Sequence, residues 1–305
     1  MFAFGKLYKK IFCISQWNIG LCRSSLEEII RQRKKHLSIN WFPLKDYETS
    51  VADPFVFKTP QGEINILYED FSMVNMSRYG TIRLMKLNER LEPAVNKEVL
   101  DTKSHLSYPF VYIENGKTYV IPESKHARET ACYQYNFEND SLINKKVLID
   151  NLPLLDSTIV KHNNKYWLFA TMGGEFQHSK LYIYYADELL GAYKPHKKNP
   201  VKYSLQSARP AGNFFYVDGA LYRPSQNCKA YYGKSIVINK VIKLTEDEFE
   251  ETNYLELTQQ RGSRFSDGMH TINAAGDVII VDGIRLIFDP MLKLKLFLKK
   301  RTWRQ

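Results

Sequence analysis

The segment SYPFVYIENGKTYVIPES, residues 107–124, decides the fold class, because hairpins of the same kind return along the chain. An apolar run that opens with a polar or ring residue leads into a turn, here Asn115-Gly116, and a second apolar run follows. Asn-Gly between two runs rich in aromatic and β-branched residues favours a tight β-hairpin. Each copy therefore predicts the two inner strands of a small antiparallel sheet.

Four further copies accompany this hairpin: ADPFVF with EINILYED, LLDSTIVKHNNKYWLFAT, ARPAGNFFYVDGALYRPS and GMHTINAAGDVIIVDG. Their opening residues lie roughly 50–60 residues apart, the spacing of a propeller blade of four strands. We therefore predict an all-β chain folded as a five-bladed β-propeller with a short N-terminal helical lead-in. A β-sandwich or two stacked β-domains is the alternative, because their hairpins would also alternate. The opening residues are Asp53, Tyr108, Asp156, Arg209 and His270.

Charge divides the chain into three parts. The net charge of +10 comes from its ends, since residues 1–35 carry +6, residues 291–305 carry +6, and the rest carries −2. We expect residues 1–45 to be a basic lead-in with a short helix over 24–36, where serines precede two glutamates that favour a helix start. Residues 46–290 are expected to form the propeller. Residues 291–305 are expected to be a basic tail or the strand that closes the ring.

Basic ends on a near-neutral body indicate contact with an anionic membrane surface. A nucleic-acid-binding protein would spread positive charge over its working face, so we expect no nucleic acid partner. Tails that only improve solubility are the alternative. No apolar run reaches the ~18 residues of a spanning helix, and residues 11–22 contain polar side chains and lack a clear signal-peptide cleavage site. We expect a cytoplasmic protein, peripheral at the inner membrane face.

Cysteine usage indicates neither a disulfide framework nor a structural metal. The four cysteines are scattered, without CxxC and without zinc-ligand spacing to the histidines. We expect reduced thiols, no metal and no cofactor. The chain also lacks GxSxG, HExxH and GxGxxG, which argues against serine hydrolases, zinc proteases and dinucleotide-binding enzymes.

The repeats predict where a site lies. The first strand of each propeller blade lines the central axis, so the five opening residues should meet at one end of the channel. They are chemically unlike, whereas the apolar residues that follow them are alike, and this predicts a polar pocket in an apolar scaffold. Turn capping, ion pairing and core packing are the structural alternatives for these side chains. A second group lies at the ends of second strands or just beyond: Glu69, Glu123, Arg223, Gln226 and Tyr232.

The motifs ADPFVF, YPFVYIENGKTYVIPE, LLDSTIV…YWLFAT and ARPAG…LYRPSQNC…YYG form an ordered set over roughly residues 40–290. Together they resemble the N-terminal propeller domain of glucosamine inositolphosphorylceramide transferases and related bacterial stand-alone proteins. The fold looks like that of glycoside hydrolases of the 43/32 type. That resemblance implies that Asp53 is a base or nucleophile and that Asp156 orients and tunes it, with a glutamate as the acid. In those hydrolases the acid usually follows the second aspartate, whereas Glu123 precedes Asp156. Asn227 also stands where the propeller family commonly has an aspartate.

We therefore expect a carbohydrate-active protein, foremost a glycosyltransferase-like enzyme of surface polysaccharide or glycolipid biosynthesis. Its catalytic residues would be Asp53, Glu123 and Asp156. The alternatives are a 43/32-type glycosidase with Asp53 and Glu123 as its carboxylate pair, and a glycan-binding propeller without catalysis. The expected partners are a sugar or glycolipid and a nucleotide-sugar donor, whose phosphate two arginines would bind. The expected substrate-binding residues are Tyr108, Arg209, Arg223, Gln226, Tyr232, His270 and Glu69.

Overall fold

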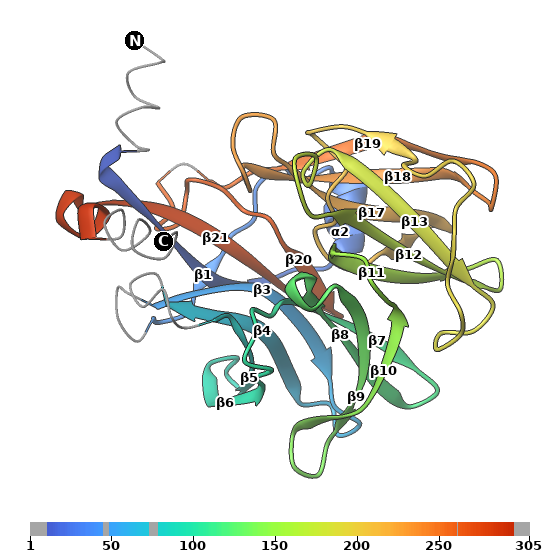
Figure 1. The fold of residues 1–305 in the computed structure, drawn as a ribbon. Coiled ribbons are helices and arrows are strands. Elements are labelled where there is room, and N and C mark those ends of the chain that lie inside the picture. The colour runs from blue at the N-terminus through green and yellow to red at the C-terminus, as the bar shows by residue number, and fades with distance from the viewer. Residues whose placement is uncertain (1–10, 45–48, 73–78, 261, 296–305) are drawn as a thin grey trace.

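A computed structural model of the chain describes residues 11–44, 49–72, 79–260 and 262–295 (Figure 1). Its strands form five antiparallel sheets around a common centre, which confirms the five-bladed β-propeller. The first sheet contains β3 (Thr49–Lys58), β4 (Ile64–Ser72), β5 (Thr81–Leu87) and β6 (Pro93–Leu100). The second contains β7 (Ser107–Glu114), β8 (Lys117–Ser124), β9 (Glu129–Asn136) and β10 (Ser141–Ile149), with the 3-10 helix η1 (Lys125–Ala127) after β8.

The third sheet contains β11 (Leu154–His162), β12 (Lys165–Met172), β13 (Lys180–Ala186), and the short β14 (Lys194–Pro195) and β15 (Lys202–Tyr203). The fourth contains β16 (Phe215–Val217), β17 (Ala220–Asn227), β18 (Ser235–Leu244) and β19 (Phe249–Leu257). The fifth contains β20 (Ile272–Ala275) and β21 (Val278–Phe288), completed by β1 (Cys13–Arg23) and β2 (Asn40–Trp41). Strands from both ends of the chain therefore build the last blade.

The inner hairpins turn where the sequence indicates. Asn115 and Gly116 have φ of 50° and 72°, and Asp218 and Gly219 have φ of 49° and 76°. Two consecutive residues with positive φ give the turn whose twist matches that of the flanking strands. In each hairpin the first strand therefore runs away from the end of the central channel at which its opening residue lies. The second strand returns to that end.

The ring of blades is closed by residues that the sequence assigns to an N-terminal lead-in. The predicted helix is present as α2 (Leu26–Gln32), with the Ser25 hydroxyl accepting from the Glu28 amide. The residues before it are not a separate lead-in, because β1 pairs with β21 along its whole length, from Cys13 opposite Phe288 to Arg23 opposite Val278. β1 is the third strand of its sheet, and side chains on both of its faces are buried, as expected for a strand covered on both sides.

The C-terminal segment does not close the ring in the part of it that the structure describes. Residues 290–295 are helical, and β1 occupies the position next to β21. The remaining residues of the predicted tail, 296–305, lie outside the described residues.

Apolar clusters lie between neighbouring blades and hold them as a ring. One joins the first three sheets through residues such as Phe55, Phe110 and Leu168. Others join the third to the fourth sheet, the fourth to the fifth, and the fifth back to the first. Burying each large apolar side chain contributes roughly 1.5–3 kcal/mol, so the packing between blades fixes the positions of the strands that carry the central polar residues.

Candidate active site

Three opening residues sit on the same backbone irregularity. In the first three sheets the pairing register skips between Ala52 and Phe55, between Ser107 and Phe110, and between Leu155 and Thr158. Asp53, Tyr108 and Asp156 occupy these bulges with φ of 52°, 41° and 53°. A bulge bends a strand and re-aims its side chain, and positive φ costs a non-glycine residue of order 1–3 kcal/mol. The fold repeats a strained conformation at the residues that the sequence places at the centre.

Backbone amides and carboxylates link the blades around the axis. The Asp53 amide donates to Asp282 Oδ2 at 3.1 Å, and the Tyr108 amide donates to Asp53 Oδ2 at 3.3 Å. The Asp156 amide donates to Glu123 Oε2 at 3.3 Å. Carboxyl groups of blades five, one and two thus each accept from the opening residue of the next blade. Asp53, Glu123, Asp156 and Asp282 are all buried.

Asp156 is held as a carboxylate by one guanidinium and one side-chain amide from the fourth blade. Arg209 donates to it twice, from Nε to Oδ2 at 2.5 Å and from Nη2 to Oδ1 at 3.2 Å. Gln226 Nε2 donates to Oδ2 at 2.9 Å. Burial alone would raise the pKa of Asp156, but the charge and hydrogen bonds of Arg209 outweigh it and lower that pKa.

At Glu123 and Asp53 burial outweighs the nearby positive charge, which is the opposite of the balance at Asp156. Burial, followed by the charge of Asp156, raises the pKa of Glu123 to about 8. Burial also raises the pKa of Asp53 to about 6, against the attraction of His270. Near neutral pH, Glu123 therefore holds a proton while Asp53 is mostly ionised. Two carboxyl groups whose environments set their pKa values apart are suited to act as acid and base.

Glu69 is a second buried carboxyl group with a raised pKa at this end of the channel. Burial raises its pKa well above the ordinary value, and the charges of Asp53, Glu123 and Asp156 add to the shift. Its Oε1 lies 3.4 Å from His105 Nε2. The Gly80 amide donates to His105 Nδ1 at 3.2 Å, so a neutral His105 carries its proton on Nε2, toward Glu69.

His270 forms part of an aromatic wall. Its ring stacks on Trp17 of β1 with centroids 3.9 Å apart, and the Tyr232 ring meets it edge-on at 5.2 Å. The Arg209 guanidinium lies 5.1 Å from the centre of the Tyr232 ring. Burial lowers the pKa of His270, but the charges of Asp282 and Asp53 outweigh burial and raise it. Trp17 and His270 are buried and cover each other, whereas Tyr232 is 39% exposed, so Tyr232 is the ring of this wall that a sugar could contact.

The ligand atoms of Asp53, His270 and Asp282 lie within 4.8 Å of one another, as the donor atoms of a metal site would. Hydrogen bonds already engage these atoms. His270 Nδ1 lies 2.5 Å from Asp282 Oδ2, the His270 and Thr271 amides donate to Asp282 Oδ1, and the Thr271 hydroxyl donates to Asp53 Oδ1 at 2.8 Å. The cluster is satisfied internally, and the expectation that the protein uses no metal stays a prediction.

The structure thus brings most of the predicted residues together, but two have other partners. Arg223 is fully buried beside β19, where its guanidinium donates to Glu251 and to the carbonyl groups of Ser207 and Ala208. It does not face the central carboxyl groups. The Tyr108 hydroxyl is 2.9 Å from Thr158 Oγ1 and accepts from the Gly212 amide at 2.7 Å, so it ties three blades together.

Sequence reasoning missed Asp282, Thr271 and Trp17. Asp282 ends the fifth hairpin in the tripeptide VDG, near the position that Glu123 occupies in the second. Aligning second strands as closely as first strands would have found it. Trp17 comes from β1, whose membership of the fifth blade no repeat in the sequence indicates.

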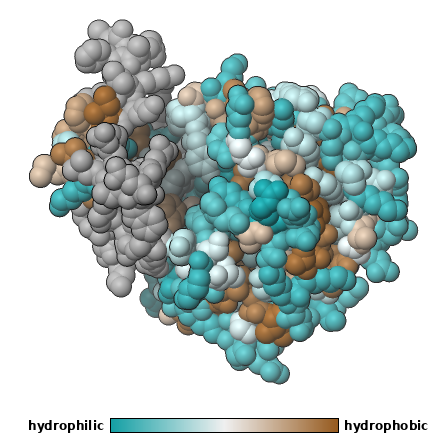
Figure 2. Space-filling view, viewed as in Figure 1, coloured by the Kyte–Doolittle hydropathy of each residue, from teal (hydrophilic) through white to brown (hydrophobic). Residues whose placement is uncertain are grey.

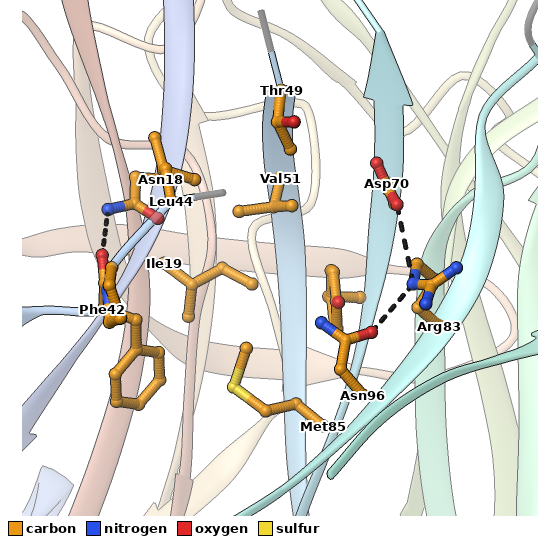
Figure 3. Close-up of a pocket in the computed structure, with 12 residues that line it drawn as sticks. Asn18, Ile19, Phe42, Leu44, Thr49, Val51, Asp70, Arg83, Met85 and Asn96 are labelled. Atoms are coloured by element: carbon orange, nitrogen blue, oxygen red, sulfur yellow. Dashed lines mark hydrogen bonds and ion pairs between the residues drawn. The ribbon is translucent and has the colours of Figure 1, made fainter. Parts of the chain in front are cut away.

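A separate cavity of about 410 Å³ lies between the first and fifth blades (Figure 3). Arg83 connects two of its polar lining residues, since its Nε lies 3.5 Å from Asp70 Oδ2 and donates to Asn96 Oδ1 at 2.8 Å. None of the residues expected to bind substrate lines this cavity. The central polar group and the cavity are therefore distinct features.

The fold and its central group define a five-bladed propeller with a carboxyl-rich candidate active site. The family described as glucosamine inositolphosphorylceramide transferase 1, N-terminal, matches residues 45–274, and the chain belongs to that family. It is 32% identical over 261 residues to glucosamine inositolphosphorylceramide transferase 1 of Oryza sativa subsp. japonica, a match that covers 81% of this chain and 35% of the relative. It is 36% identical over 209 residues to the protein of that name from Arabidopsis thaliana, covering 66% of this chain and 26% of the relative. The match thus spans between about a quarter and about a third of the length of these curated relatives.

Solved structures of glycoside hydrolases share the fold. An exo-β-1,3-galactanase from Clostridium thermocellum superposes with a TM-score of 0.55 at 10% identity, covering 75% of this chain and 58% of that one. An exo-β-1,3-galactanase from Phanerochaete chrysosporium with galactose gives a TM-score of 0.55 at 12% identity, covering 72% and 55%. At such identities the similarity concerns the fold alone.

Proposed function

We propose that this chain is a carbohydrate-active enzyme that acts at a glycosidic carbon by general acid–base catalysis. Asp53 is the base, and Glu123 is the acid that protonates the leaving oxygen. Asp156, paired with Arg209, stays ionised and keeps Glu123 protonated. The observation that carries the proposal is that Asp53 and Glu123 are both buried at one end of the channel, each accepting from the backbone amide of the next blade, in surroundings that raise the pKa of Glu123 more than that of Asp53.

Glycosyl transfer is the first candidate reaction, because the relatives are named as transferases. In this reaction Asp53 takes the proton of an acceptor hydroxyl as that oxygen attacks the sugar, and the bond to the donor's leaving group breaks. Tyr232, the exposed ring of the aromatic wall, would contact the sugar, and the stacked Trp17 and His270 would support it from behind. The acceptor class proposed is a glycan or glycolipid of surface-polysaccharide assembly.

Hydrolysis is the second candidate, and the residues at the centre favour it. Around the five carboxyl groups, the one arginine is already paired with Asp156, Lys125 Nζ lies 4.0 Å from Glu123 Oε1, and Arg223 lies elsewhere. A donor phosphate would need free cationic groups, whereas a pair of carboxyl groups is sufficient to cleave a glycosidic bond. Water then takes the place of the acceptor hydroxyl beside Asp53.

A screen of nucleotide sugars and aryl glycosides against wild type and Asp53→Ala tests the proposal. Turnover of a nucleotide sugar only with an acceptor indicates transfer, and turnover of an aryl glycoside in water indicates hydrolysis. Glu123→Gln and Glu69→Gln form a matched pair, in which only the former should remove most of the activity. Activity that survives Asp53→Ala would reject the assigned base. Sugar binding without turnover of any donor would indicate that the protein is a glycan-binding module without catalysis.

A further inference from the structure

A second feature, on the fifth blade, is independent of the proposed chemistry. Five large apolar side chains are exposed where the two described ends of the chain meet: Ile11 (47%), Phe12 (38%), Phe288 (58%), Met291 (70%) and Leu294 (54%). We name this group the terminal platform. Figure 2 shows apolar residues at the left of the molecule, beside the grey termini, where β21 ends in Figure 1.

The platform is held together by described contacts. The Phe12 and Phe288 rings lie 6.3 Å apart, and the Asp289 amide donates to the Phe12 carbonyl at 3.0 Å. The Asp289 side chain accepts from the Leu292 amide at 2.8 Å and so begins the helical segment 290–295. The apolar side chains are therefore displayed on an ordered base.

Charge identifies the partner that suits this surface. Residues 1–12 and 291–305 together contain nine Lys or Arg residues and no Asp or Glu, and these alternate with apolar residues, as in MLKLKLFLKK. Apolar side chains bordered by cations are typical of segments that lie in the interface of an anionic bilayer. A second copy of the chain would bring two such positive regions together, so charge repulsion disfavours a dimer through this face.

The platform lies on the same side of the propeller as the candidate active site. Each second strand ends at the polar centre, but β21 continues six residues beyond Asp282, to Phe288, and β1 pairs with it throughout. At about 3.3 Å per residue, the pair extends roughly 20 Å past the carboxyl groups. A bilayer that contacts the platform would therefore lie on the side to which the site opens.

We propose that the terminal platform binds the surface of an anionic membrane and turns the candidate active site toward it. The proposal goes beyond the assigned chemistry and does not depend on it. A substrate carried on a lipid would then approach the carboxyl groups from the membrane side.

Co-sedimentation of the full chain with vesicles tests the binding. We expect binding to phosphatidylcholine vesicles that contain phosphatidylglycerol, with little binding to phosphatidylcholine alone and loss of binding at high salt. Phe288→Ser with Met291→Ser should weaken binding at least tenfold, whereas Ile113→Ser should not. Ile113 is a matched control because it is 52% exposed and lies beside the Asn115-Gly116 turn, at the opposite end of its blade.

Charge reversal provides a variant that leaves the apolar packing unchanged. Lys293→Glu and Lys295→Glu should each weaken vesicle binding roughly fivefold or more. Absence of binding to anionic vesicles would overturn the proposal, as would equal losses in the platform variants and in Ile113→Ser. A concentration-dependent dimer that the platform variants abolish, without vesicle binding, would show a protein partner instead.

The orientation has its own test. The native cysteines are buried, so an introduced surface cysteine can be labelled selectively. An environment-sensitive dye at Ala230→Cys, after the mouth-side end of β17, should be quenched by lipids with a nitroxide headgroup, whereas one at Asn115→Cys should not. Both positions are exposed in the structure. The reverse pattern would place the site away from the membrane and reject the orientation.

Discussion

Two buried ionic clusters among the described residues differ in their balance of charge. Beside β19, Glu251 is surrounded by cations, since Arg223 donates to both of its oxygens and Lys202 Nζ lies 2.7 Å away. At the centre, five carboxyl groups have one arginine, one lysine and two histidines beside them, and only Asp156 has hydrogen bonds from a guanidinium. Burial would raise the pKa of Glu251, but Arg223 outweighs it and lowers that pKa, whereas the pKa values of Glu123 and Glu69 stay raised.

Compensation by cations distinguishes the cluster beside β19 from the candidate active site. The cluster beside β19 contains buried charges of the same kinds, but every described carboxylate in it has cationic partners. The central cluster holds more acid than its cations compensate, and two of its members, Asp53 and Asp156, sit on bulges with positive φ. Uncompensated charge together with backbone strain, rather than burial or charge alone, points to a site.

The largest effect should come from Asp53→Asn at the central cluster. An amide cannot accept a proton, so turnover of the substrate found in the screen should fall by about 10²–10⁴-fold. The free energy of unfolding should change little or rise, because one buried carboxylate among several is removed. Glu63→Gln, at an exposed carboxylate, is the control for kinetics and urea denaturation. Unchanged turnover would place the chemistry elsewhere.

Substitutions in the cluster beside β19 should lower the free energy of unfolding rather than the turnover. Arg223→Met leaves Glu251 buried with Lys202 alone, and breaking a buried ion pair in this way costs about 3–5 kcal/mol of unfolding free energy. Urea denaturation measures the loss, and Lys202→Met should lose less because Lys202 contributes one contact and is partly exposed. A stable Arg223→Met protein with weakened substrate binding would reassign Arg223 to the site, as its sequence position suggested.

The pH dependence of stability should separate wild type from Glu123→Gln. The pKa of Glu123 in the folded protein, about 8, lies above its ordinary value of 4.5, so between these values the folded state retains a proton that the unfolded chain has lost. Wild type should therefore lose stability relative to the variant as pH rises from 4.5 to about 8, by at most ~1.4 kcal/mol per pH unit. Urea denaturation across this range measures the difference. Parallel pH profiles would show that Glu123 is ionised in the folded protein.

The smallest of these effects should come from Tyr108→Phe. Its hydroxyl connects Thr158 with the Gly212 amide across blades, and removing it leaves that buried amide without a partner. The expected cost is about 1–3 kcal/mol of unfolding free energy, with an unchanged KM. A raised KM with unchanged stability would make Tyr108 a substrate-binding residue, as its place among the opening residues suggested.

The repeated hairpins of the propeller could be predicted from the sequence. The strand that completes the fifth blade could not. Hairpins with recurring openings were sufficient to place Asp53, Asp156 and Arg209 around one axis. The role of β1 was beyond reach, because Cys13–Arg23 resembles no other strand and pairs with residues about 270 positions away. Arg223 was misplaced for a related reason. Its partner Glu251 lies two strands further along, and no local pattern shows which face of β17 the guanidinium takes.

The most direct test of the account is a pH titration of the side-chain carboxyl groups by ¹³C NMR, with Asp53→Asn and Glu123→Gln used to assign the signals. It needs no substrate and asks only whether the two groups differ in protonation. The account predicts an aspartate that titrates near pH 6 and a glutamate that titrates near pH 8. If Asp53 and Glu123 both titrate at ordinary carboxyl values, below about 5, the proposed acid–base pair is wrong.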